Sequence, residues 1–129
     1  MSKAATAPPI ELASADATIA QEMTRWLSHL GSERRLSPKT LEAYARDLRQ
    51  CLDFLCTHWG ERVTLTRFAA LEASDIRAFM AMRRADDVSG RSLMRALAGL
   101  RSFGRFLERD EWSMNGLGLE NRNRRGSGG

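Results

Sequence analysis

The stretch from residue 89 to residue 109 places apolar and basic side chains on opposite faces of a helix. At about 100° per residue, five apolar side chains share one narrow arc: Leu93, Ala96, Leu100, Phe103 and Leu107. The opposite arc is polar and mostly basic: Arg91, Arg95, Ala98, Ser102, Arg105 and Arg109. Ser89 can cap this helix by accepting a hydrogen bond from an otherwise unpaired backbone N–H. The pattern predicts a helix with one buried face and one face suited to anions.

The positive charge of the chain lies in its last third. Residues 1–36 carry four basic and four acidic side chains, residues 37–88 carry eight of each, and residues 89–129 carry eight basic and four acidic ones, so the last segment accounts for the net charge of +4. Within the predicted helix only Glu108 is acidic, so we expect its arginines to be largely without acidic partners on the same helix: Arg91, Arg95, Arg101 and Arg105. Guanidinium groups bind phosphates and base edges through paired hydrogen bonds. We therefore expect a polyanionic partner, the alternative being an ordinary solvated helix face.

A second amphipathic helix is predicted to begin after Ser37, with Pro38 at its first position, and to end at Gly60. Its apolar arc contains Leu41, Ala45, Leu48, Leu52, Leu55 and Trp59. Its opposite arc contains Lys39, Ala43, Arg46 and Gln50. The positive end of the helix dipole also favours phosphate at the N-terminus, so this helix offers a smaller basic strip.

Two further helices are predicted from caps and spacing. The first begins near Asp16, stops at Gly31 and packs through Ile19, Met23, Trp26, Leu27 and Leu30. The other is capped by Ser74 and covers residues 75–85, with Asp75 in its first turn. Between them, residues 61–70 are predicted to form an extended loop that packs Val63, Leu65 and Phe68. The expected result is an all-α domain of four helices.

The ends of the chain have a different composition. Residues 1–15 are rich in Ala, Ser and Thr and contain Pro8-Pro9, which predicts a disordered leader. The helical domain is expected over residues 16–118. Residues 119–129 contain glycine and arginine without a helical period, and are interpreted as a linker or an artificial end.

No catalytic or metal-binding motif is found in the sequence. Phosphate-binding glycine loops, metalloprotease motifs and Cys-x-x-Cys pairs are all missing. Cys51 and Cys56 point to different faces of a helix and are expected to be reduced thiols. No apolar run of about 18 residues and no signal pattern occur, which predicts a cytoplasmic protein without membrane contact. We expect no catalytic residue, metal, cofactor or small-molecule ligand in this chain.

Residues 36–55, LSPKTLEAYARDLRQCLDFL, and residues 89–107, SGRSLMRALAGLRSFGRFL, together resemble the N-terminal core-binding domain of tyrosine recombinases, most closely the Xer branch. The resemblance covers residues 17–118. The sequence departs from the family pattern at Cys51, where an aromatic residue is common, at Gly104, where tyrosine is usual, and at Asn115-Gly116, where Asn-Pro is common. These departures leave open whether the chain is of the XerC or the XerD type.

The resemblance implies an orthogonal bundle of four helices, built as two crossed helical hairpins (a SAM-like core-binding domain). The helices over residues 37–58 and 89–109 would enter the major groove of a recombination half-site, as one jaw of a clamp. The catalytic tyrosine domain has no counterpart here, so the chain would bind double-stranded DNA without cutting it. The full-length protein would recombine DNA, in chromosome dimer resolution or integration, within a tetrameric synapse of recombinase protomers. The isolated domain would be a monomer.

The residues that match DNA-facing positions of such domains lie on both basic helices: Lys39, Thr40, Arg46, Arg91, Ser92 and Arg95. Arg101 and Arg105 lie further along the last helix and are expected to contact phosphates. For Thr40 the alternative is a purely local hydrogen bond at the helix start. Two other functions remain open: a transcription regulator of the helix-turn-helix type, and a bundle whose arginine face meets an acidic protein helix.

Overall fold

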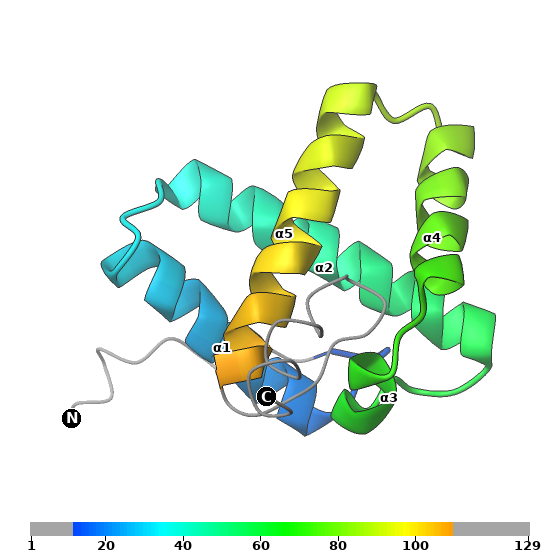
Figure 1. Ribbon diagram of the computed structural model, residues 1–129, viewed down its shortest axis with the longest axis horizontal. Coiled ribbons are helices and arrows are strands. Elements are labelled where there is room, and N and C mark those ends of the chain that lie inside the picture. The colour runs from blue at the N-terminus through cyan, green and yellow to red at the C-terminus, as the bar shows by residue number, and fades with distance from the viewer. Residues whose placement is uncertain (1–11, 110–129) are drawn as a thin grey trace, which may run out of the picture.

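A computed structural model describes residues 12–109 of the chain (Figure 1). This part is all α-helical, with four long helices and one short one: α1 (Ala17–Ser32), α2 (Pro38–Trp59), α3 (Leu65–Ala69), α4 (Ala73–Ala85) and α5 (Gly90–Arg109). Figure 1 shows α1 and α2 as one hairpin, α4 and α5 as a second, and α5 crossing in front of α2. Helix α5 contacts α1, α2 and α4. The predicted all-α fold is confirmed.

The helix ends that the sequence predicted from capping residues are confirmed at four places. The side chain of Asp16 accepts from the backbone N–H of Ile19 at 3.1 Å, and Ser37 and Ser89 play the same part at the starts of α2 and α5. Gly60 ends α2 with a φ of 75°, in the left-handed region that only glycine adopts without strain. These caps fix where each basic helix begins relative to its neighbours.

Other boundaries differ from the prediction. Helix α1 continues through Gly31 to Ser32, and α4 begins two residues before Asp75, with Glu72 rather than Ser74 at the N-cap. The Asp75 carboxylate accepts from the Glu72 backbone N–H at 3.0 Å, as the third residue of a capping box does, so the helix start is fixed by Glu72 and Asp75 rather than by Ser74. In both cases the prediction chose the wrong capping residue: the C-cap of α1 is Glu33, and the N-cap of α4 is Glu72.

The segment predicted as an extended loop contains the short helix α3. Thr64 caps it by accepting from the Arg67 backbone N–H at 3.1 Å, which is enough to close one turn. The prediction was therefore wrong about the conformation of Leu65–Ala69. It was right about packing, because Val63, Leu65 and Phe68 are all buried.

The packed region begins before Asp16, inside the segment predicted to be a disordered leader. Ser14 and Ala15 are buried. The Val63 backbone N–H donates to the Ser14 carbonyl at 2.8 Å, and the Asp16 N–H donates to the Val63 carbonyl at 3.0 Å. The Arg62 guanidinium also donates to the Ala15 carbonyl at 2.6 Å. Residues 1–11 of the predicted leader, residues 110–118 of the predicted domain and the predicted linker lie outside the described residues.

The core is formed where the two hairpins cross. All five apolar residues predicted for the buried face of α5 are buried, and Phe103 lies 5.1 Å from the Trp26 ring and 5.7 Å from the Phe68 ring between centroids. The burial of Trp26 confirms its predicted packing role. Its indole N–H donates to the hydroxyl of Ser102 at 3.0 Å. The aromatic cluster thus fixes α5 against α1 and α3, and with it the direction of the outward face of α5.

Candidate nucleic-acid interface

The outward face of α5 is a row of exposed residues that we call the α5 strip: Arg91, Met94, Ala98, Arg101 and Arg105. Within residues 12–109, the guanidinium groups of its three arginines have no hydrogen bond, ion pair or ring contact. Met94, at 62% exposure, is the exposed large hydrophobic residue of the described chain. The α5 strip therefore offers three free cations and an apolar side chain to a partner.

The α5 strip is shifted around the helix relative to the predicted polar arc: it includes Met94 and Arg101, and it lacks Arg95, Ser102 and Arg109. Ser102 is half-buried and accepts the hydrogen bond from Trp26. The Arg109 Nη1 lies 3.3 Å from the His29 Nε2. The helices packed against α5 partly cover Arg95 and Ser102, which are half-buried, whereas Arg109 is exposed at the C-terminal end of α5.

Arg95 does not have the unpaired guanidinium group that the sequence indicated. Its Nε donates to Oδ2 of Asp47 at 2.8 Å, and its Nη2 donates to Oδ1 at 3.0 Å. Asp47 is buried on α2, with a side chain 1% exposed, whereas the Arg95 side chain is 35% exposed. The hydrogen bond with Asp47 raises the pKa of Arg95. The sequence test for partners looked one helical turn away, and Asp47 is 48 residues away on another helix.

On α2, the predicted basic strip is exposed at Lys39 and Arg46. Thr40 instead takes part in a local network, where its backbone N–H donates to the Ser37 hydroxyl and that hydroxyl donates to the Thr40 side chain at 3.0 Å. This geometry supports the alternative reading of Thr40. Ser92 likewise lies in the first turn of α5, with its N–H on the Ser89 cap.

Three exposed arginines near these helices were not chosen by the sequence analysis. Arg34 and Arg35 lie in the connector before α2, and Arg49 lies on α2 one turn after Arg46. Arg49 is outside the predicted polar arc because the arc was centred on Lys39 and Gln50. The signal that could have found it is the spacing of three residues from Arg46, which places both on neighbouring parts of one helix face.

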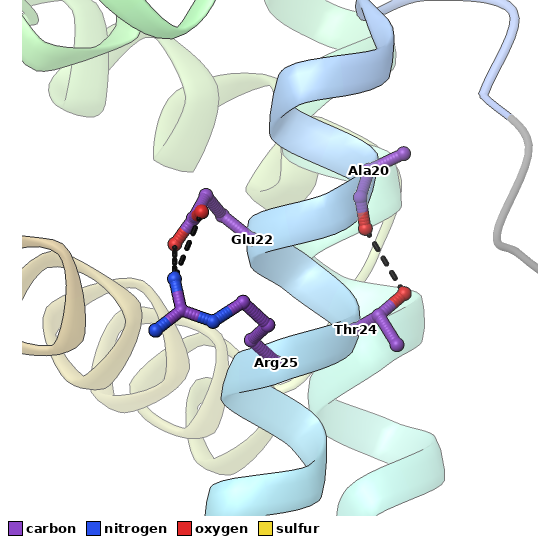
Figure 2. A network of polar contacts seen from close by, with 4 residues as sticks. All are labelled: Ala20, Glu22, Thr24 and Arg25. Atoms are coloured by element: carbon purple, nitrogen blue, oxygen red, sulfur yellow. Dashed lines mark hydrogen bonds and ion pairs between the residues drawn. The ribbon is translucent and has the colours of Figure 1, made fainter.

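Other arginines of the described chain are held in intramolecular contacts. Figure 2 shows the pair on α1 in which Arg25 Nη1 contacts both carboxylate oxygens of Glu22, at 2.7 and 3.0 Å. Arg67 of α3 pairs with Glu61 at 2.6 Å and stacks 4.3 Å from the centroid of the Trp59 ring. These contacts hold Arg25 and Arg67 within the domain, whereas the three guanidinium groups of the α5 strip have no such partner among residues 12–109.

The described residues show no group of three or more potential metal ligands. None of the helices among residues 12–109 is long and apolar enough to cross a membrane. Cys51 and Cys56 are free thiols, as predicted, and burial together with the charge of Asp75 raises the pKa of Cys51.

The chain belongs to the family described as "Phage integrase, N-terminal SAM-like domain", because residues 23–111 match it. Among curated proteins it is 88% identical over 110 residues to the tyrosine recombinase XerC of Bradyrhizobium diazoefficiens, a match that covers 85% of this chain and 34% of that protein. It is 70% identical over 98 residues to the XerC of Nitrobacter winogradskyi, covering 76% of this chain and 30% of the relative. No solved structure matches.

The chain thus spans about a third of the length of the curated relatives that it matches. The family resemblance predicted from residues 36–55 and 89–107 is confirmed. Of the two types that the sequence left open, these relatives carry the name XerC.

Proposed function

We propose that this chain is the DNA-binding domain of a tyrosine recombinase of the XerC type, and that α2 and α5 grip duplex DNA. The observation that carries the proposal is the α5 strip, where Arg91, Arg101 and Arg105 are exposed and free of intramolecular partners. Spaced along a helix, such groups suit the phosphates that flank a groove. The XerC names of the relatives support the same partner.

The two helices would make different contacts. Lys39 and Arg46 extend the basic surface onto α2, which crosses behind α5 (Figure 1). Arg91 lies in the first turn of α5, where a side chain can enter a groove end-on. Arg101 and Arg105 lie about three and four turns further along and would contact phosphates, which position a protein without reading sequence.

The activity of the whole protein is part of the same proposal. The remaining two thirds of a XerC-type protein would carry the tyrosine that cuts and rejoins DNA, and further recombinase protomers would complete a synapse in the cytoplasm. This chain would supply binding and orientation at one half-site. Recombination in chromosome dimer resolution or integration would then depend on its grip.

The salt dependence of DNA binding tests the proposal. Log affinity for a duplex of mixed sequence should fall linearly with log salt, because bound cations release counterions. Replacing Arg91, Arg101 and Arg105 by alanine should reduce the slope by about 0.9 for each phosphate that is no longer neutralised. Arg67→Ala is the control for each single replacement, since it also removes one charge, but from a guanidinium group already paired with Glu61, and it should leave the slope unchanged.

Two outcomes would contradict the proposal. One is a chain that is folded by circular dichroism but binds no duplex in dilute buffer. The other is an equal slope for the wild-type chain and the triple variant, which would show that the α5 strip does not contact DNA. Binding to an acidic helical peptide in place of DNA would favour the protein-interaction bundle instead.

A further inference from the structure

The pair formed by Asp47 and Arg95 lies where α5 crosses α2, between the two basic surfaces. Arg46 is the neighbour of Asp47 on α2, and Arg91 is one turn before Arg95 on α5; both are exposed. The carboxylate is buried, and both of its oxygens accept from the guanidinium group. The arginine, at 35% side-chain exposure, remains accessible to solvent. The geometry therefore joins a buried anion to a cation at the surface.

The atoms used by this pair leave a defined part of the guanidinium group free. A guanidinium group has five N–H bonds in a plane. Asp47 takes the edge formed by Nε and Nη2. The opposite edge, formed by Nη1 and the second hydrogen of Nη2, is a second fork of two parallel donors. No other hydrogen bond holds Arg95 within residues 12–109.

We propose that Asp47 is a positioning residue that holds Arg95 so that its free Nη1/Nη2 fork reads a guanine in the major groove. Guanine presents two acceptors there, O6 and N7, and arginine binds them with two parallel donors. Because Asp47 already restrains the side chain, less rotamer freedom is lost when the base is bound. The inference rests on the proposed function and adds which base α5 would select.

Arg95 differs from the arginines of the α5 strip in its charge environment, because only Arg95 is paired with a carboxylate. The carboxylate of Asp47 neutralises it locally, so Arg95 contributes little to the attraction of phosphates at a distance. The arginines of the α5 strip have no such partner and would supply the binding that is independent of sequence. The domain would therefore divide the two tasks between a paired arginine that reads a base and free arginines that hold the backbone.

Base-analogue substitution tests this inference. Duplexes bound by the wild-type chain are first selected from a library with a randomised centre, and each guanine in the selected sequence is then replaced by 7-deazaguanine, which lacks the N7 acceptor but still pairs with cytosine. At one guanine the wild-type affinity should fall by about 5- to 10-fold, the effect of losing one hydrogen bond of a bidentate pair. Arg95→Ala should bind the two duplexes equally, whereas Arg105→Ala should keep the wild-type ratio.

Asp47→Asn tests the positioning role. It should reduce the discrimination between guanine and 7-deazaguanine to less than about twofold, because the amide no longer fixes the fork. It should also steepen the salt slope by about 0.9, since the charge of Arg95 becomes available to phosphates. A purely structural ion pair would lower the melting temperature without changing either quantity, and that result would overturn the inference.

The remaining outcomes are also decisive. If Asp47→Asn does not fold, Arg95→Lys carries the test, because lysine keeps a charge beside Asp47 but has no fork; retained discrimination would refute the assignment, and its loss would support it. DNA binding without sensitivity to any 7-deazaguanine would refute only the guanine reading. Absence of DNA binding in dilute buffer would instead refute the proposed function.

Discussion

At the scale of single residues, Ser102 shows how a hydrogen bond to a buried side chain turns a position of the polar arc into a packed one. The Trp26 ring is fully buried, and its indole N–H has Ser102 as its acceptor at 3.0 Å. A buried donor without an acceptor costs about 1–3 kcal/mol. Ser102 therefore belongs to the packing of α5, although its position in the sequence pattern placed it among the polar residues.

Ser102→Ala should lower the free energy of unfolding by about 1–3 kcal/mol, because the indole N–H of Trp26 loses its acceptor. Urea unfolding measures the change. Thr24→Ala is the control: Thr24 is exposed, its hydroxyl donates to the Ala20 carbonyl within α1 (Figure 2), and its removal should change stability by less than about 0.5 kcal/mol. Equal losses in the two variants would show that the hydrogen bond to Trp26 contributes nothing specific.

Cys51 makes stability depend on pH in the alkaline range. Burial raises the pKa of its thiol above the ordinary value of 9.0. Above pH 9.0 the unfolded chain loses this proton while the folded chain keeps it, so the folded state binds more protons. Stability should then fall with rising pH, by up to about 1.4 kcal/mol per pH unit from this group, and should not depend on it at lower pH.

The measurement is urea unfolding of the wild-type chain and of Cys51→Ala over this alkaline range. The alanine variant has lower stability at every pH because it leaves a cavity, but its slope against pH should be smaller than that of the wild-type chain. Parallel slopes would mean that the Cys51 thiol ionises in the folded chain as readily as in the unfolded one.

At the scale of helices, local chemistry predicted most of the fold. Helix α2 is the clearest case. Ser37 and Pro38 define its start, and Gly60 defines its end. The short helix α3 was missed because a single turn shows no periodicity, and only its Thr64 cap indicates it. The start of α4 was misplaced by two residues because Glu72 and Asp75 together satisfy the first turn.

The candidate site was less predictable than the helices that carry it. Periodicity placed Arg91 and Arg105 on the polar arc, and both are exposed; Arg101, also exposed, was chosen for its charge and its place further along the helix. Arg95 could not be assigned in the same way, because the residue that binds it is on α2. Pairing between helices depends on how they cross, and no spacing within one helix contains that information.

At the scale of the whole molecule, one helix supplies both the core and the candidate interface. The buried face of α5 includes Leu100 and Phe103, and its outward face is the α5 strip. Figure 1 shows α5 crossing α2, and α5 also contacts α1 and α4. Stability and DNA binding should therefore be separable by substitutions on opposite sides of α5.

Leu100→Ala should lower the free energy of unfolding by about 2–5 kcal/mol, a large share of the roughly 5–15 kcal/mol of an ordinary domain. Met94→Ala, a similar truncation at the exposed face of α5, should leave the melting temperature nearly unchanged.

Because a ligand that binds only the folded state stabilises it by mass action, adding excess duplex should raise the melting temperature of Leu100→Ala as it does that of the wild-type chain. In the triple variant of Arg91, Arg101 and Arg105, by contrast, the duplex should produce little shift, although the free variant melts near the wild-type temperature. An unchanged melting temperature for Leu100→Ala would contradict the burial of Leu100, and a full duplex-induced shift in the triple variant would place the DNA-binding surface elsewhere on the molecule.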